Sequence, residues 1–237
     1  MTRHWKPRPG YHDRVRTEIL PLVPLGGGTL LDIGGGTGAT ALWLRKHGLA
    51  SRVGVVDRIA PLGGPRLLDF RETGDIEDPH VLARTFARTG PVQTILCLDV
   101  LEQLRDPWSI VRRLHRGLAP GGSIIASISN VRHYQTVLPL LLRNRWTLTE
   151  DGPLDRMHLR FFVRPTAIGL MTCSGLALDR IVPVPSGGPR TRRFRMMTLG
   201  LLNSFTDRRY LIRVRRTDGI PDRKEPTEDP VSAEPSE

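Results

Sequence analysis

Thr29-Leu30-Leu31-Asp32-Ile33-Gly34-Gly35-Gly36-Thr37-Gly38 is the stretch that decides the fold. Its apolar residues run into an acid and a glycine cluster, and a helical segment from Ala39 to Gly48 follows. A buried strand, a tight glycine turn and a helix N-terminus together predict a nucleotide-binding turn. Glycine reaches positive φ and lets a ligand approach where a Cβ would collide. The turn alone leaves the choice between NAD, FAD and S-adenosylmethionine open.

The composition is that of a globular protein with one sizeable α/β core. The 237 residues are 39% apolar and 25% charged, with a formal charge of +11. Positive charge of this size can indicate a nucleic-acid or anionic surface. However, lysine occurs only at positions 6, 46 and 224, so nearly all of the charge is arginine. Such a bias often follows genomic base composition, and we favour that explanation.

The two cysteines, Cys97 and Cys173, lie in apolar segments, which argues against a disulfide framework or a cysteine-based zinc site. We therefore expect no metal. The N-terminal residues lack the apolar segment of a signal peptide, and no apolar run approaches the roughly 18 residues of a membrane span. These features predict a cytoplasmic protein.

The remaining chain alternates apolar strand patterns with helical ones, which predicts a doubly wound α/β sheet. We expect a basic N-terminal arm over 1–10, one folded domain over 11–216 and a disordered, acidic, proline-rich tail over 217–237. The later expected strands are 52–57, 66–71, 94–99, 123–129, 176–184 and 209–216. The expected helices are 11–23, 39–47, 79–88, 107–118, 137–143, 164–174 and 192–205.

Polar residues close successive expected strands. They are Asp32, Asp57, Asp75, Asp99 and Asn130. In a doubly wound sheet, ligands bind beyond the carboxyl ends of the strands. One acid there is expected as a helix cap, but acids after four strands in succession indicate a binding site.

The chain at this point resembles the class I S-adenosylmethionine-dependent methyltransferases. Leu31–Gly38 matches the first motif of that family, Gly74–Asp78 the segment that meets the adenine, and Leu98–Leu104 the block after the fourth strand. The resemblance implies a Rossmann-like, seven-stranded, mostly parallel sheet with an antiparallel last strand. It also implies S-adenosylmethionine as cofactor, held by Asp32, Gly34, Gly36, Gly38, Asp57, Asp75, Ile76, Asp99 and Val100.

The segments 129–133, 145–146 and 154–162 look like one bacterial branch of that family. Members of that branch tend to be associated with glycan or O-antigen-type biosynthesis and are similar to ubiquinone-type O-methyltransferases. The resemblance implies O-methylation of a small molecule or a glycan precursor. The acceptor and the oligomeric state stay open.

Methyl transfer is an in-line displacement, so the protein mainly has to align the acceptor and, for a hydroxyl, help remove its proton. The family often has a histidine at the position of Gln103, and glutamine cannot take a proton. His158 and His133 are the candidate bases, with Asp155 as a possible partner; a structural role is an equal alternative. The candidate acceptor-binding residues are Asn130, Arg156 and Arg160, of which the arginines suit an anionic acceptor.

Three other readings remain. The basic folded part allows RNA methylation, although few aromatics are available for stacking. Gln103 and the short link Arg58–Pro65 allow a non-catalytic methyltransferase-like subunit, because either a crossover helix is missing or the third strand starts later. Arg192–Phe205 allows contact with a membrane surface, with packing on the sheet as the favoured alternative.

Overall fold

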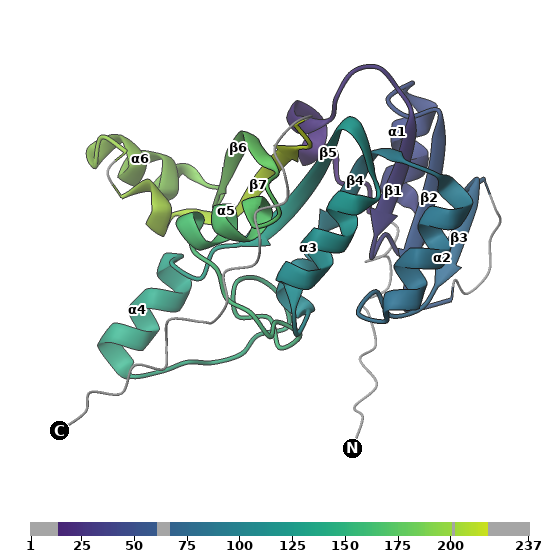
Figure 1. Ribbon diagram of the computed structural model, residues 1–237. Helices are drawn as coiled ribbons and strands as arrows, with labels where there is room; N and C mark the ends of the chain where they lie inside the picture. Colours follow the sequence, from purple (N-terminus) through teal and green to yellow (C-terminus); the bar gives the residue numbers. More distant parts are fainter. Residues whose placement is uncertain (1–13, 61–66, 201, 218–237) are drawn as a thin grey trace.

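A seven-stranded mixed sheet forms the centre of the protein (Figure 1). The structure is a computed structural model that describes residues 14–60, 67–200 and 202–217. Its strand order is β3-β2-β1-β4-β5-β7-β6, and β7 alone runs antiparallel to its neighbours. The predicted fold class is therefore confirmed. The strands are β1 (Thr29–Ile33), β2 (Arg52–Asp57), β3 (Phe70–Thr73), β4 (Val92–Leu98), β5 (Leu118–Ser129), β6 (Ala177–Pro185) and β7 (Asp207–Arg215).

Helices cover both faces of this sheet. One face packs against α1 (Ala39–Lys46) and the 3-10 helix η2 (Thr17–Leu22), where Ile19, Leu22 and Leu44 join the core. The other packs against α2 (Pro79–Thr89), α3 (Pro107–Arg116) and α5 (Arg164–Thr172). The remaining described helices are η3 (Leu101–Gln103), α4 (Tyr134–Arg143), α6 (Pro189–Met197) and η4 (Asn203–Phe205).

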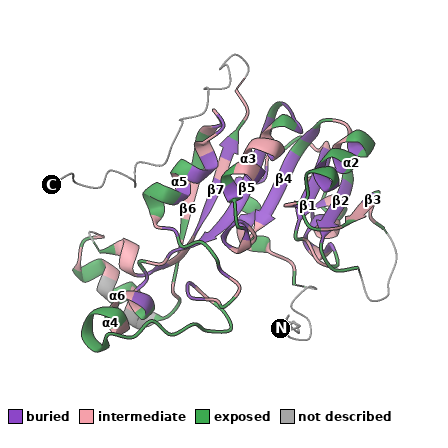
Figure 2. Cartoon of the chain, turned by 60° about the horizontal axis from the view of Figure 1, so that its bottom comes forward, coloured by how far each residue is buried: buried purple, intermediate pink, exposed green. Residues whose placement is uncertain are grey.

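The central strands are apolar on both sides because helices cover both sides. All five residues of β1 are buried, as are the last eight of β5 (Figure 2). Helix ends follow the predicted signals: the carboxylate of Asp106 accepts the Ser109 N–H at 3.0 Å, and Pro107 occupies the first turn of α3. These caps fix where each helix leaves the edge at which the strands end.

The third strand begins later than expected. It starts at Phe70, not at position 66: the carboxylate of Asp69, and not a backbone carbonyl of the segment before it, accepts the N–H of Val53 in β2 at 2.7 Å, and it also pairs with Arg45 at 3.0 Å. This outcome favours the second explanation of the short link. Part of that link, 61–66, lies outside the described residues, and no helix is present in its described part.

The segment before β1 is a 3-10 helix instead of the expected longer helix. Pro21 lies inside it and has no N–H to donate, so regular helical bonding cannot continue there. Residues 11–13, the predicted arm (1–10) and the tail beyond 217 lie outside the described residues.

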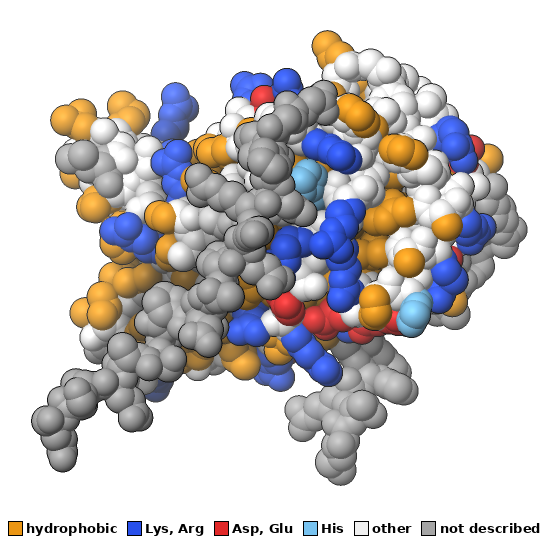
Figure 3. Space-filling view, viewed as in Figure 1, with side chains coloured by type: hydrophobic (Ala, Val, Ile, Leu, Met, Phe, Trp, Pro, Cys, Tyr) orange, Lys and Arg blue, Asp and Glu red, His pale blue; other side chains and the backbone are white. Residues whose placement is uncertain are grey.

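Helices α4 and α6 extend from the sheet instead of lying flat on it (Figure 1). Leu141 and Leu142 of α4 are 73% and 76% exposed, and Met197 of α6 is 75% exposed. The expected helix 192–205 is divided in two, since Leu199 and Gly200 take positive φ between α6 and η4. None of the described helices has the length and apolar character needed to cross a membrane. Positive side chains gather over α3, which carries Arg112, Arg113 and Arg116 (Figure 3).

Gly54 of β2 allows β3 to pack, and this yields a test of the sheet. A Cβ at Gly54 would lie 1.8 Å from a ring carbon of its register partner Phe70. We expect Gly54→Ala to lower the free energy of unfolding by about 1–3 kcal/mol, measured by urea denaturation. The matched control is Gly169→Ala in α5, where a Cβ would meet nothing within 4 Å. It should be neutral or stabilising by up to about 1 kcal/mol, and equal losses in both variants would contradict the packing argument.

Candidate active site

The glycine turn after β1 has no room for a Cβ at Gly34 or Gly35. Gly34, Gly36 and Gly38 have φ of 68°, 56° and 83°, in the left-handed region that glycine tolerates. A Cβ at Gly35 would lie 2.7 Å from the carboxyl carbon of Asp32, and one at Gly34 would lie 2.6 Å from Cγ2 of Val100. The turn therefore presents bare backbone where β1 gives way to α1.

Asp57 joins this turn to the end of β2. Its Oδ2 accepts the Gly36 N–H at 2.8 Å and its Oδ1 accepts the Ile59 N–H at 2.9 Å. A carboxylate has about four acceptor sites, so each oxygen retains capacity for one hydroxyl. The backbone carbonyl of Asp57 accepts the Gly74 N–H at 2.9 Å, which brings Asp75 and the buried Ile76 to the same edge. The structure thus places Asp57, Asp75 and Ile76 beside the glycine turn.

Asp32 lies below the turn and is 3% exposed. Burial raises the pKa of its carboxyl to about 7, and the charge of Asp57 adds to this while Arg16 opposes it. Asp32 lies on the α1 face of the sheet, because it is two residues along β1 from Leu30, which packs on that face. Its proximity to the glycine backbone ties the shape of the turn to β1.

Asp99 forms an ionic cluster at the end of β4. Its Oδ2 accepts from Nη1 of Arg16 and from Nη1 of Arg209, both at 2.8 Å, and its Oδ1 accepts from the Ser127 hydroxyl at 2.7 Å. Burial raises the pKa of Asp99, but Arg209, Arg16 and Ser127 outweigh it, so the pKa is lowered overall. Asp99 also takes a φ of 58°, which is uncommon for a residue with a side chain.

Sequence reasoning missed Arg16 and Arg209. The two residues are separated by most of the chain, and only the fold brings them to one carboxylate. The one available signal was the position of Arg209 at the start of a strand that reaches the functional edge of the sheet. That signal does not distinguish Arg209 from the other arginines of this arginine-rich chain, and Arg16 has none.

Glu102 lies beneath this cluster in η3 and is 1% exposed. Its Oε1 accepts the Ser129 N–H at 2.6 Å, and its Oε2 has no partner among the described residues. Burial, reinforced by the charge of Asp99, raises the pKa of Glu102 to about 7. Its backbone carbonyl accepts the N–H groups of Leu159 and Arg160 at 2.8 and 2.9 Å. Glu102 therefore attaches the downstream loop to the end of β4.

That loop carries His158, which is buried. Burial lowers its pKa, and the Pro153 carbonyl and Asp155 oppose this. The charge of Asp99 also raises the pKa, and that of Arg209 lowers it. The ring is consequently neutral at pH 7. Its Nδ1 lies 3.4 Å from the Pro153 carbonyl, which favours a proton on Nδ1 and a basic lone pair on Nε2. The Asp155 carboxylate accepts the Met157 N–H at 2.8 Å and so shapes the turn.

His133, the other candidate base, belongs to a different group of residues. It caps α4, and its Nε2 lies 2.6 Å from the Ser186 hydroxyl at the end of β6. Burial, with a contribution from Arg208, lowers its pKa to about 4. The structure thus brings His158, but not His133, into the electrostatic surroundings of Asp99.

The three candidate acceptor-binding residues make contacts within the protein. Asn130 Nδ2 donates to the carbonyls of Ser204 and Asp207 at 2.7 and 2.8 Å. Arg156 pairs with Glu150 at the surface, at 3.2 Å. Arg160 donates to the Arg105 carbonyl and lies over the Trp108 ring. Their acceptor-binding roles stay predictions.

The arrangement suits a nucleoside whose sugar hydroxyls meet Asp57 and whose neighbouring groups meet the bare glycine backbone. Among the described residues, no group of three histidine, cysteine or acidic side chains is placed to hold a metal. Together with the strand order, these features define the fold and cofactor edge of an S-adenosylmethionine-dependent methyltransferase.

Comparison with known proteins agrees with this class. The methyltransferase domain family matches residues 5–180. The chain is 27% identical over 199 residues to the ubiquinone biosynthesis O-methyltransferase of Pseudomonas entomophila strain L48, covering 83% of this chain and 82% of the relative. It is 28% identical over 195 residues to the protein of the same name from Pseudomonas paraeruginosa, covering 81% and 80%.

Solved structures show the same fold. A methyltransferase from Mesorhizobium loti aligns with a TM-score of 0.56 at 18% identity, covering 84% of this chain and 96% of that one. One from Archaeoglobus fulgidus aligns with a TM-score of 0.57 at 12% identity, covering 85% and 91%. The chain belongs to the methyltransferase domain family. It is an S-adenosylmethionine-dependent methyltransferase, as the sequence predicted.

The raised pKa of Glu102 predicts how stability varies with pH. The folded protein binds this proton more tightly than the unfolded chain, whose glutamate has an ordinary pKa of 4.5. The contribution of Glu102 to stability is therefore lost as the pH rises from about 4.5 to about 7. Glu102→Gln keeps an oxygen for the Ser129 N–H and removes the buried charge. We expect it to gain stability relative to wild type across this window, by roughly 3 kcal/mol at most.

Urea denaturation at pH 5 and pH 8 measures this difference. The control is Glu150→Gln, whose side chain is 60% exposed, and which should show the same difference at both values. A Glu102→Gln difference that does not grow with pH would contradict a buried, protonatable Glu102.

Proposed function

We propose that this methyltransferase transfers its methyl group to an oxygen of a small-molecule acceptor, with His158 as the general base. The observation that carries the proposal is the neutral, buried His158 within electrostatic reach of Asp99, at the edge where the strands end. The names of the relatives, ubiquinone biosynthesis O-methyltransferase, support an oxygen acceptor. Those names mention no glycan, so the proposal does not extend to one.

The cofactor-binding residues in this proposal are those the sequence singled out. The bare backbone of Gly34, Gly36 and Gly38 receives the cofactor, and Asp57 accepts from its ribose hydroxyls through the free capacity of both oxygens. Asp75 and Ile76 lie where the adenine would meet the end of β3. S-adenosylmethionine supplies a methyl group already activated on a sulfonium.

The remaining task of the chain is to orient the acceptor and to receive its proton. His158 suits that task because a neutral imidazole with a free Nε2 lone pair can accept a hydroxyl proton. Its loop is hydrogen-bonded to the backbone carbonyl of Glu102, three residues after Asp99, so the ring is held near the end of β4. Gln103, where the family often has histidine, donates from Nε2 to the Asp99 carbonyl at 2.8 Å.

Asp57→Asn tests the cofactor site. An amide offers one acceptor oxygen in place of two, so one charge-assisted hydrogen bond is lost. We expect the affinity for S-adenosylhomocysteine, measured by isothermal titration calorimetry, to fall about 10- to 100-fold. The control is Asp179→Asn, which removes an acid paired with Arg213 and Arg215 on β6 and should leave affinity unchanged. Undiminished binding in Asp57→Asn would contradict the assigned role.

His158→Gln tests the base. We expect kcat to fall about 10²- to 10⁴-fold while the KM for S-adenosylmethionine stays unchanged. Because the pKa of His158 is lowered, wild-type activity should persist below pH 6.5, and the acidic limb of the rate profile should vanish in the variant. His47→Gln, a surface histidine stacked on Trp43, is the control.

Release of S-adenosylhomocysteine is measured with a panel of hydroxyl-bearing and amine-bearing small molecules, and with total RNA. Turnover of hydroxyl compounds alone supports the proposal. Turnover of amines or RNA without hydroxyl compounds would overturn it, and full activity in His158→Gln would remove His158 from the mechanism.

A further inference from the structure

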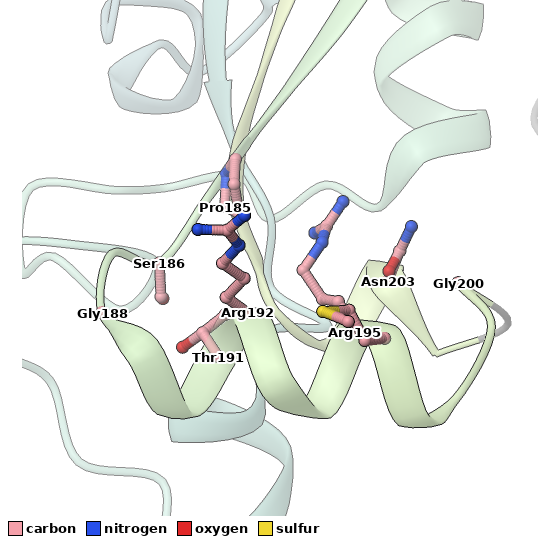
Figure 4. Close-up of a pocket in the computed structure, with 9 residues that line it drawn as sticks. Pro185, Ser186, Gly188, Thr191, Arg192, Arg195, Gly200 and Asn203 are labelled. Carbon is pink, nitrogen blue, oxygen red and sulfur yellow. The ribbon is translucent and has the colours of Figure 1, made fainter.

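A cavity of about 680 Å³ lies between the end of β6, helix α6 and η4 (Figure 4). Its size is in the range of small-molecule sites. The lining includes two arginines, two hydroxyl groups and one amide: Arg192, Arg195, Ser186, Thr191 and Asn203. In Figure 4 the side chains of Arg192 and Arg195 extend from α6 on the same side, and that of Arg192 reaches toward Pro185 at the end of β6.

The two arginines of the lining supply the positive charge and the N–H donors that an anion needs. Arg195 donates through Nη1 to the Thr206 hydroxyl at 2.9 Å and to the Asp207 carboxylate at 2.6 Å. Both described bonds use Nη1, and Nε and Nη2 carry three further N–H groups. Arg192 adds a second guanidinium, and no acid is among the lining residues. Asp207 thus fixes the position of Arg195, and Arg192 supplies positive charge beyond that pair.

Ser186 adds a hydroxyl donor whose direction is set by His133. The pKa of His133 is lowered to about 4, so the ring is neutral, and its Nδ1 accepts the Gln135 N–H at 3.4 Å. The ring proton is therefore on Nε2, which donates to the Ser186 oxygen at 2.6 Å. Since that oxygen already accepts, its own proton is directed elsewhere, and Ser186 lines the cavity.

Asn203 supplies the opposite kind of group. Its Oδ1 is buried and has no hydrogen-bond partner among the described residues. A buried acceptor without a partner is costly, which points to a donor that the protein alone does not provide. Because this oxygen has almost no accessible surface, it meets a ligand hydroxyl only when the Asn203 amide turns toward the cavity that the residue lines. In that orientation the cavity combines donors for an anion with an acceptor for a hydroxyl.

The cavity also connects to the reaction edge. Asp207 and Arg209 are two residues apart at the start of β7, on either side of a register shift in the pairing of β6 with β7. Asp207 holds Arg195 in the cavity, and Arg209 holds Asp99 at the end of β4. A small molecule with its acid group in the cavity would extend past the start of β7 toward Asp99.

We infer that this cavity binds the phosphate group of a hydroxyl-bearing phosphate monoester, and that this group anchors the acceptor. The statement that the bound molecule is the methyl acceptor rests on the proposed function, whereas the phosphate site is argued from the residues of the cavity alone. Arg192, Arg195 and Ser186 donate to the phosphate, and Asn203 accepts from a hydroxyl of the same molecule. The sequence had assigned anion binding to Arg156 and Arg160, which the fold uses at the surface.

A ³¹P NMR titration with glucose 6-phosphate tests the site directly. We expect Arg192→Gln to weaken binding at least about tenfold and Ser186→Ala to weaken it several-fold. The matched control is Arg193→Gln, which removes the same charge from the next residue of α6, outside the cavity lining. Binding in Arg193→Gln should equal that of wild type. Equal weakening by Arg192→Gln and Arg193→Gln would show general attraction to a basic surface and overturn the site.

Two further measurements separate this inference from its alternatives. Saturating S-adenosylhomocysteine should leave glucose 6-phosphate binding intact, and competition between them would place the phosphate in the cofactor site and overturn the inference. The phosphate of a lipid headgroup has the same chemistry. The protein is therefore also sedimented with phosphatidylglycerol vesicles. If it pellets with them and both Arg192→Gln and Arg193→Gln reduce the pelleting, the arginines bind a membrane surface, and the inference of a soluble phosphate ligand is overturned.

Failure of this inference is distinguishable from failure of the proposed function. If the protein binds S-adenosylhomocysteine in calorimetry but does not bind glucose 6-phosphate, only the phosphate site is overturned. If the protein binds glucose 6-phosphate in a way that depends on Arg192 but methylates only amines, only the proposal of an oxygen acceptor is overturned.

Discussion

The ion cluster on Asp99 is the interaction on which the functional edge depends. A single, partly buried carboxylate connects the segment before η2 through Arg16, β5 through Ser127 and β7 through Arg209. Burying Asp99 alone would be costly, and the two arginines with the serine offset that cost. Removal of either arginine would leave the charge partly unpaired, so segments far apart in the chain are held at one point.

The cluster also decides which acids of the site keep their charge. Asp99 has direct cationic partners, and its pKa is lowered. Glu102 has no cationic partner within hydrogen-bonding distance among the described residues. It is buried near the charge of Asp99, and its pKa rises to about 7. Asp32 shows the same effect of burial. One charged acid thus lies beside two acids that can be protonated, which limits the number of negative charges that this small volume must stabilise.

Sequence patterns predicted the fold because the parallel half of the sheet is built from local signals. β1, β4 and β5 are built around short apolar runs, and Asp78 and Asp106 cap the helices that follow β3 and β4. The strand-end acids follow from this order, since each closes its own strand. β3 begins later than the apolar residues Leu67 and Leu68 indicate, because the Asp69 side chain, and not a backbone carbonyl before it, accepts the Val53 N–H of β2.

The acceptor side could not be predicted in the same way. Arg209, Arg195 and Asp207 acquire their roles through side-chain contacts across the antiparallel part of the sheet, and no residue spacing encodes these contacts. Conversely, Asn130 and Arg156 looked available in the sequence but have partners within the protein. Contacts of this kind depend on the packing of α6, η4 and β7, which the pattern of apolar residues leaves undetermined.

The change from histidine to glutamine at position 103 fits this structure rather than weakening the case for catalysis. Gln103 donates to the Asp99 carbonyl at 2.8 Å and so supports the positive φ of that residue. Glutamine has no basic atom, and the nearby neutral histidine is His158, on a loop that bonds to the Glu102 carbonyl. Support of the strand end and acceptance of a proton are then divided between two residues. Because the loop of His158 is attached beside Gln103, a change at either position alters the geometry of the same site.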